Sequence, residues 1–322
     1  IIHRSSADDQ VIVAIDKAEW ALQVRRRLVG YPLSRNSIMV MERIAVQALK
    51  LLPKNLVSRA FGSVSEVEFP PPLQSTVNRV FADFTGVDLD ESEQDPDAYA
   101  SLNAFFTRKL RAGSRPVATD DAAELVSPVD GVLSHFGPIV DNTLIQAKGR
   151  EYRLVDLVDS GRERHIFDGG HFATMYLSPR DYHRIHSPSS GDVSHISYIP
   201  GHLFPVNPFA VRNIDELFAV NERLISYIDN PKLGRLGVVK VGATCVGRIG
   251  VSFHDIETNH RFRRRRELEL DEPVGVQHGD ELGIFNLGST VIVLIEHPDF
   301  AFDESLAPGQ HLKVGQFLGR VQ

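Results

Sequence analysis

The sequence has very little cysteine: Cys245 is the only one among 322 residues. A single thiol excludes an intramolecular disulfide framework and a zinc site built from cysteines, and it is compatible with a reducing compartment. Because Cys245 lies in the apolar run from 241 to 246, we interpret it as a small core residue.

Long hydrophobic runs are also missing. No segment reaches the roughly 18 to 20 apolar residues needed to span a bilayer, and residues 1–4 lack the charged start and apolar block of a signal peptide. The formal net charge of −7 argues against a general nucleic-acid binder, because phosphate contacts need a basic surface. A hydrophobic content of 42% predicts a folded globular protein with a substantial core.

The N-terminal third is predicted to be helical. Helices are expected at about 16–29, 36–52, 74–85 and 102–110. In the segment 36–52, the polar residues Arg43, Gln47 and Lys50 form one narrow stripe, and apolar residues cover most of the remainder. Such a helix either packs on the protein core or lies in a membrane interface. Residues 1–35 carry no pattern that indicates a role.

The later part of the chain has short β-branched runs separated by Gly, Pro, Asp and Asn. We therefore predict an α+β protein with a β-rich core, barrel-like or sandwich-like, at 121–322, behind a helical membrane-associating segment at 36–120 and an extension at 1–35. Strands are expected at 132–134, 143–145, 172–177, 193–199, 238–250, 292–295 and 314–321. The basic run 261–266 is either a solvated loop or a contact for anionic head groups.

The dipeptide Gly288-Ser289 stands just before the apolar run Val291 to Ile295, which predicts a buried strand with the serine at its mouth. The Ser289 hydroxyl is within reach of the preceding carbonyl, and a glycine at 288 removes the Cβ that would block the approach. Attack there would give a backbone ester that eliminates to dehydroalanine and hydrolyses to a pyruvoyl group. The alternative is an ordinary turn at the start of a strand.

Two histidines, His183 and His186, follow the strand expected at 172–177. They could be metal ligands, structural histidines or, for one of them, a general base that takes a proton from a serine. We expect no metal, because prolines bracket the segment and no third ligand stands at a recognisable spacing. Asp130 is either a turn residue or the carboxylate that orients the base. Spacing alone does not bring Asp130, His186 and Ser289 together.

Several segments resemble, in order, the motifs of phosphatidylserine decarboxylases, and the resemblance covers about 50–322. The segments are Pro128 to Ser134, Gln146 to Gly149, Tyr176 to His186, Asn221 to Arg223, Val241 to Thr244 and Phe285 to Thr290. Residues Leu102 to Arg108 also fit, except that Ala104 stands where the family usually carries Glu. The Leu-Gly-Ser-Thr form at 287–290 is typical of bacterial and mitochondrial members that associate with membranes.

The resemblance implies a pyruvoyl-dependent carboxy-lyase that converts phosphatidylserine to phosphatidylethanolamine and CO₂. Ser289 would be the self-cleavage nucleophile and the source of the covalent pyruvate cofactor. His186 would be the general base and Asp130 the residue that orients it, while His183 would act in the decarboxylation. The pyruvoyl carbonyl would accept the electrons left by CO₂, and His183 would protonate the resulting carbanion.

The resemblance also implies a proenzyme. Cleavage between Gly288 and Ser289 would give a β chain, 1–288, and an α chain, 289–322, that stay associated. The expected partners are phosphatidylserine, a membrane surface and the protein's own two chains; a homo-oligomer is left open, and no nucleic acid is expected. The expected location is peripheral, at the cytoplasmic face of a bacterial inner membrane or at a mitochondrial inner membrane in a eukaryote.

Two other functions stay open from the residues alone. One is a pyruvoyl decarboxylase that acts on a soluble amino acid. The other is a non-catalytic β-rich binding module, which the turn-rich ending Val314 to Arg320 would suit. The second reading gives no purpose to the motifs around Asp130, His186 and Ser289.

Overall fold

A computed structural model describes residue 58 and residues 62–147, 149–244, 248–259, 264–286 and 289–322. These residues all belong to one unit that runs from Pro53 to Gln322. The helices expected at 16–29 and 36–52, as well as Cys245 and Gly288, lie outside the described residues.

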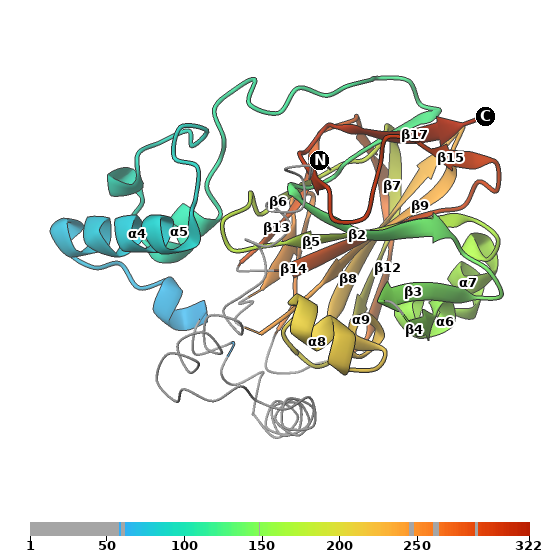
Figure 1. Ribbon diagram of the computed structural model, residues 1–322, viewed down its shortest axis with the longest axis horizontal. Helices are drawn as coiled ribbons and strands as arrows, with labels where there is room; N and C mark the ends of the chain where they lie inside the picture. Colours follow the sequence, from blue (N-terminus) through green and yellow to red (C-terminus); the bar gives the residue numbers. More distant parts are fainter. Residues whose placement is uncertain (1–57, 59–61, 148, 245–247, 260–263, 287–288) are drawn as a thin grey trace, which may run out of the picture. The chain divides into compact units, whose positions relative to one another are not determined.

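An eight-stranded antiparallel sheet forms the centre of the unit, in the order β12-β7-β8-β9-β14-β5-β2-β16 (Figure 1). Its strands are β2 Gly131–Pro138, β5 His171–Leu177, β7 Gly191–Ile199, β8 Arg223–Asn230, β9 Gly234–Val241, β12 Arg266–Val276, β14 Ser289–Ile295 and β16 His311–Leu312. Strand β14 pairs with β5 on one side and β9 on the other, and all of its residues are buried. The apolar run from Val291 to Ile295 suits a strand that is covered on both faces.

Three smaller sheets complete the β structure, with the orders β11-β10-β13-β6, β1-β17-β15 and β3-β4. Their strands are β1 Glu124–Val126, β3 Thr143–Ala147, β4 Arg150–Arg153, β6 Arg184–His186, β10 Ile249–Val251, β11 His254–Glu257, β13 Glu281–Phe285, β15 Phe300–Phe302 and β17 Phe317–Val321. No sheet of the described residues closes on itself, so the barrel-like form is absent, while the β-rich α+β class is confirmed.

Short helices cover one face of the large sheet. They are α6 Leu154–Val158, α7 Gly161–Phe167, α8 Pro208–Asn213 and α9 Leu217–Val220. Arg223 of β8 donates to the carbonyl of Leu157 in α6 at 2.5 Å, and the ring of Tyr227 stacks on Phe167 of α7. Side chains alternate between the two faces along each strand. Ser289 and Val291 share a face with Lys240 of β9 and Leu224 of β8, whereas Arg223 points to the face that the helices cover. Ser289 therefore lies on the face opposite the helices.

The predicted helix 74–85 is confirmed as α4, Pro71–Thr85, which begins with two prolines and ends at Gly86 in the left-handed conformation. The helix predicted at 102–110 is too long: α5 spans Leu102–Phe106, and Ser101 caps its start. A short 3₁₀ turn, η1 Pro96–Ala98, lies between them. In the described part of the chain, no helix has the length and apolar character required to cross a membrane.

Two predicted strands also differ at their ends. The run 238–250 is two strands, since β9 ends at Val241 and β10 starts only at Ile249. The run 314–321 begins too early, because Gly315 has a φ of 82° in a turn that precedes β17.

Candidate active site

Ser289 is the first residue of β14 and lies opposite Leu177 of β5. Its side chain is fully buried, and its Oγ has no hydrogen-bond partner among the described residues. Burying a hydroxyl without a partner costs roughly 1 to 3 kcal/mol, so such an atom calls for an explanation. Gly288 lies outside the described residues, and cleavage between the two residues therefore stays a prediction.

His183 lies in the loop between β5 and β6 and is fully buried. Its Nδ1 is 2.8 Å from the carbonyl oxygen of Asp181. Because a carbonyl only accepts, the proton must be on Nδ1, and Nε2 carries a lone pair. Nε2 has no partner in the described chain, and the ring of Phe106 lies 4.0 Å from the imidazole between centroids. Burial lowers the pKa of His183 to about 4, so the ring is neutral at pH 7.

The fold brings the His183 loop to the region where β14 begins. The main-chain N–H of Phe285, at the end of β13, donates to the carbonyl of His183 at 3.0 Å. Only three residues separate Phe285 from Ser289. Asn286, the first of them, accepts a hydrogen bond from Asn103 of α5 at 3.0 Å. Two unpartnered polar atoms, His183 Nε2 and Ser289 Oγ, thus lie on segments that adjoin.

His186 ends β6 and has partners on both ring nitrogens. Nδ1 is 2.6 Å from the carbonyl oxygen of Gly279, and Nε2 is 3.2 Å from the hydroxyl of Tyr182. The ring is therefore oriented by a carbonyl, where sequence reasoning expected a carboxylate. Burial lowers the pKa of His186, so Nε2 is unprotonated at neutral pH and able to accept a proton.

Asp130 lies in the turn before β2, where Gly131 is needed because a Cβ would lie 2.6 Å from the carbonyl oxygen of Tyr176. The Asp130 carboxylate accepts from Nε of Arg115 at 2.8 and 3.1 Å and from the main-chain N–H of Val314 at 2.9 Å. No hydrogen bond joins Asp130 to His186 in the described structure. The charge of Asp130 raises the pKa of His186 through space, against the larger effect of burial.

Among the described residues, no hydrogen bond links Asp130, His186 and Ser289 into a triad. The structure places Asp130, His183, His186 and Ser289 around the junction of β2, β5, β6 and β14, and it pairs Asp130 with a cation that sequence reasoning missed. Their assignment to individual catalytic roles stays a prediction. The described residues contain no group of three or more side chains suited to hold a metal ion.

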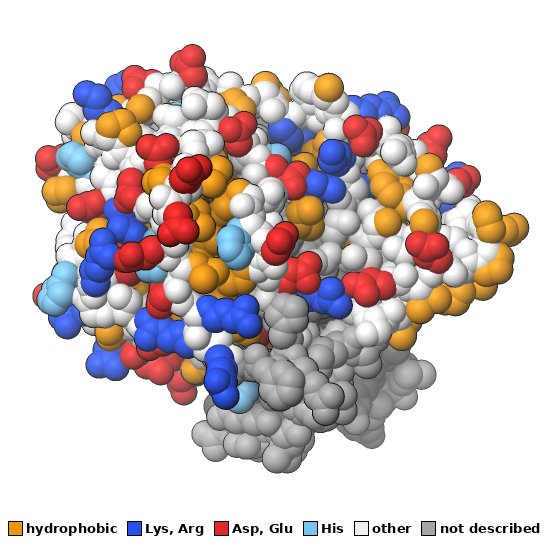
Figure 2. Space-filling model, turned by 180° about the vertical axis from the view of Figure 1, so that it is seen from behind, with side chains coloured by type: hydrophobic (Ala, Val, Ile, Leu, Met, Phe, Trp, Pro, Cys, Tyr) orange, Lys and Arg blue, Asp and Glu red, His pale blue; other side chains and the backbone are white. Residues whose placement is uncertain are grey.

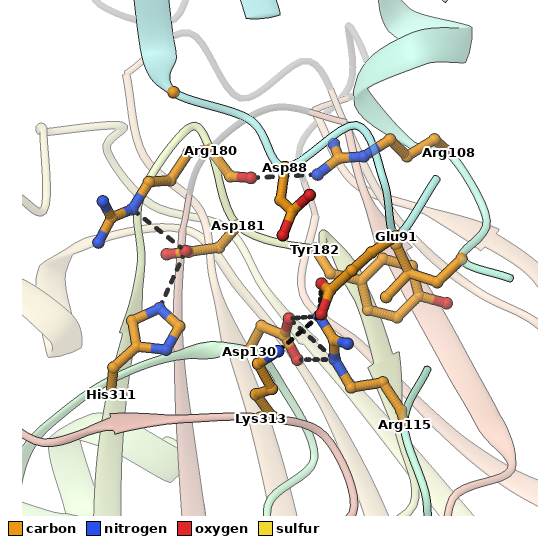
Figure 3. Close-up of a pocket in the computed structure, with 12 residues that line it drawn as sticks. Asp88, Glu91, Arg108, Arg115, Asp130, Arg180, Asp181, Tyr182, His311 and Lys313 are labelled. Atoms are coloured by element: carbon orange, nitrogen blue, oxygen red, sulfur yellow. Dashed lines mark hydrogen bonds and ion pairs between the residues drawn. The ribbon is translucent and has the colours of Figure 1, made fainter. Parts of the chain in front are cut away.

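A pocket of about 250 Å³ is lined by Asp130 and by Asp181 and Tyr182, which precede His183 in its loop (Figure 3). Its lining residues are Gly86, Asp88, Glu91, Arg108, Leu110, Arg115, Asp130, Arg180, Asp181, Tyr182, His311 and Lys313. Figure 3 shows Arg115 between Asp130 and Glu91, and His311 directed at Asp181. The mixture of acidic and basic groups suits a ligand that carries both signs of charge.

Three motif residues outside this region hold the scaffold together. Gln146 donates to the carbonyls of Val211 and Ile214 and so fixes the connection between α8 and α9. Asn221 bonds main-chain groups of Phe204 and Gly242, and the buried Arg223 donates to carbonyls at the ends of α6 and α9. These residues satisfy main-chain groups that would otherwise be buried without partners.

Comparison with known proteins gives a consistent result. The family model described as phosphatidylserine decarboxylase matches residues 102–320. A phosphatidylserine decarboxylase proenzyme of Anaeromyxobacter sp. (strain K) is 43% identical over 281 residues, which are 86% of this chain and 98% of that protein. Proenzymes of the same name from Myxococcus xanthus and Azoarcus sp. (strain BH72) are 40% and 41% identical, over 86% of this chain and 98% and 96% of their own lengths.

Proposed function

The chain belongs to the phosphatidylserine decarboxylase family, and we propose that Ser289 is the residue that this enzyme converts to its pyruvoyl group. The enzyme is a carboxy-lyase, made as a proenzyme, that converts phosphatidylserine to phosphatidylethanolamine and CO₂. The observation that carries the proposal is the buried, unpartnered Oγ of Ser289 at the start of a central strand. Similarity over most of the chain argues against both alternatives, a decarboxylase of a soluble amino acid and a binding module.

Self-cleavage would begin with addition of Ser289 Oγ to the carbonyl carbon of Gly288. The hydroxyl proton passes to a base, the nitrogen of Ser289 leaves as an amine, and an ester replaces the peptide bond. Loss of the α proton of Ser289 and of the Gly288 carboxylate then leaves dehydroalanine, which water hydrolyses to a ketone and ammonia. His186 is the proposed base, and its Nε2 must exchange the Tyr182 hydroxyl for that of Ser289 to accept the proton.

The same site would then carry out decarboxylation. Bound at position 289, the pyruvoyl group supplies an electron sink for the pair released when the bond from Cα to the carboxylate breaks. His183 is proposed to protonate Cα from Nε2. The low pKa of His183, about 4, means that the ring must first gain a proton, and the negative charge of an incoming head group favours that gain. Phe106 against the ring limits the access of water.

The two chains would stay together after cleavage. In the proposed α chain, β14 lies between β5 and β9, β16 pairs with β2, and β17 pairs with β1. All the partners in these ladders belong to the β chain. We infer that cleavage after residue 288 gives two chains that remain folded together.

Attachment to a membrane surface is supported by the orientation of α4. The helix buries Gln74 and Asn78, which are hydrogen-bonded to each other at 2.8 Å, and it exposes Leu73, Val80 and Phe84, whose exposures are 50, 60 and 69%. Figure 2 shows hydrophobic side chains gathered at the end of the unit that α4 occupies. Exposing lipid chains to water costs about 0.8 kcal/mol for each CH₂, so the enzyme must meet its substrate in the bilayer. We infer a peripheral enzyme at the cytoplasmic face of a bacterial inner membrane.

The test is the intact mass of the purified protein. We expect two chains, the smaller beginning at residue 289 with a pyruvoyl-blocked N-terminus, and release of CO₂ from phosphatidylserine. Ser289→Ala is expected to remain one chain without activity, whereas Ser305→Ala, an exposed serine in the same segment, is expected to cleave normally. A folded wild-type protein that stays whole would refute the proposal.

A further inference from the structure

Arg108 is an unusual cation in the wall of the pocket (Figure 3). The residue is only 3% exposed. Its Nη2 donates to the carbonyl oxygen of Arg180 at 3.1 Å, whereas Nε and Nη1 are buried and have no acceptor among the residues that the structure describes. A guanidinium stays protonated in proteins, so these N–H groups need a hydrogen-bond acceptor at every pH.

The other cationic side chains that line the pocket are neutralised. Arg115 pairs with Glu91 and Asp130, Lys313 lies 2.6 Å from Glu91, and Arg180 lies 3.7 Å from Asp181. Within the described residues, Arg108 has no carboxylate within the same range. The four Arg and Lys side chains of the lining are matched in number by Asp88, Glu91, Asp130 and Asp181, so what sets Arg108 apart is that its buried donors have no carboxylate of the described chain within reach. A buried charge without a partner is expected where a ligand supplies the partner.

We propose that Arg108 binds the phosphodiester of the phosphatidylserine head group, a site that rests on the proposed function of the pocket. Arg108 Nη2 donates to the carbonyl of Arg180, the residue before Asp181, whose own carbonyl holds Nδ1 of His183, so the guanidinium lies against the loop of His183. Phe106, two residues earlier, lies against the ring of His183, and the positive charge of Arg108 lowers the pKa of His183 in addition to the larger effect of burial. In the head group, phosphorus is three bonds from Cα, so a residue that holds the phosphate must lie close to the residue that protonates Cα.

The phosphate suits Arg108 better than the substrate carboxylate does. The carboxylate loses its charge as it becomes CO₂, and an arginine bound to it would stabilise the ground state more than the transition state. The phosphate keeps its charge in the substrate, the transition state and the product. Arg108 would therefore contribute binding that is equal throughout the reaction, which affects KM rather than kcat.

The unpartnered donors of Arg108 are buried, and so is the side chain of Ser289, the residue that becomes the pyruvoyl group with which the substrate amine must react. Asn103 Oδ1 is another buried polar atom without a partner in the described chain, and it belongs to the residue that contacts Asn286, three positions before Ser289.

The experiment uses the processed, full-length enzyme with phosphatidylserine in detergent micelles, and glycerophosphoethanolamine as a soluble inhibitor. This probe has the phosphodiester and the amine but no carboxylate. For Arg108→Gln we expect complete self-cleavage, a roughly 10- to 100-fold increase in both KM and the inhibition constant, and kcat within about threefold of the wild type. The matched control is Arg111→Gln, which removes an exposed arginine of the same segment and is expected to change neither constant.

Three results would refute the proposal that Arg108 binds the phosphodiester. A lower kcat with unchanged KM and inhibition constant would place Arg108 on the carboxylate or in the scaffold. Inorganic phosphate that inhibits as strongly as the probe, with the same loss in Arg108→Gln, would indicate a site for free phosphate. If the glutamine variant does not fold, Arg108→Met takes its place, and wild-type constants in that folded variant would also refute the proposal. A wild type that cleaves no chain or releases no CO₂ would instead refute the proposed function.

Discussion

The Nε2 of His311 lies 3.0 Å from the carboxylate of Asp181, and these two residues fall on opposite sides of the proposed cleavage. Asp181 also accepts from the main-chain N–H and the hydroxyl of Ser178, and its own carbonyl holds Nδ1 of His183. The α chain would therefore contribute the side chain that steadies the loop of His183. This contact would give the α chain a part in decarboxylation, in which His183 is proposed to act, rather than in self-cleavage.

We predict that His311→Ala leaves self-cleavage complete and lowers kcat by about fivefold, the effect of losing one charge-assisted hydrogen bond. His311→Gln keeps a donor for Asp181 and should recover most of the turnover. His297→Ala, a change of the same kind in the same chain, should have no effect. Steady-state kinetics on fully processed protein measures all three, and an equal loss in the alanine and glutamine variants would contradict the role of the hydrogen bond.

The second prediction concerns the contribution of the Arg115–Asp130 ion pair to stability and to self-cleavage. The side chains of the pair are only 9% and 5% exposed, so Asp130→Asn or Arg115→Met alone should destabilise the protein by about 3 kcal/mol, because each leaves a buried group unpaired. The double variant Arg115→Met with Asp130→Leu should recover part of that stability. If Asp130 also serves His186 in cleavage, the double variant will fold and still remain one chain. Denaturation and intact mass separate the two effects, and normal cleavage would limit Asp130 to the scaffold.

Local pattern predicted the parts of the site that lie on regular elements. The apolar run after Ser289 indicated a buried strand, and Asp130 before glycine indicated a turn, because each depends only on neighbours in sequence. Arg115 and His311 gave no such signal. They act through contacts with Asp130 and Asp181 that span 15 and 130 positions, and no local periodicity encodes contacts of that range.

Two errors in the predicted elements have a related cause. Strand β8 was missed because it begins with Arg223, a charged residue that is buried only because distant carbonyls accept its hydrogen bonds. The helix from Leu102 was predicted too long because its pattern continues through Arg108, whose side chain instead enters the pocket wall. In both places a tertiary contact overrides a local preference.

The neutral state of His183 predicts how stability depends on pH. Its pKa is about 4 in the folded chain and 6.5 when exposed, so between these values the unfolded state binds a proton that the folded state does not. Lowering the pH from 7 to 4 should therefore reduce the free energy of unfolding of the uncleaved Ser289→Ala chain, by up to about 3 kcal/mol from this residue. Adding His183→Gln should flatten the profile. An identical profile in both chains would contradict the assignment.

Burial of Lys240 in β9 predicts how the free energy of unfolding depends on pH above neutrality. Lys240 is fully buried, its Nζ donates to Ser226 Oγ at 2.7 Å, and burial lowers its pKa from 10.5 to about 7. At pH 7 the unfolded chain carries a full charge there and the folded chain does not. Lys240→Met should therefore stabilise the protein by at least about 1 kcal/mol at pH 7, and the gain should shrink towards pH 10. Chemical denaturation at the two pH values would measure it, and a gain that grows with pH would contradict it.

The apolar face of α4 predicts how the enzyme holds to a membrane. Because Leu73, Val80 and Phe84 point away from the core, replacing all three with serine should leave the fold intact and weaken the salt-resistant part of vesicle binding by at least about tenfold. Turnover of micellar substrate should change less than turnover in vesicles. The control replaces three apolar residues exposed elsewhere: Val117, Val140 and Ile145. Flotation with anionic vesicles at low and high salt measures the binding. Equal losses in the two triple variants would show general hydrophobic adsorption, and no loss in either would move the contact to another surface.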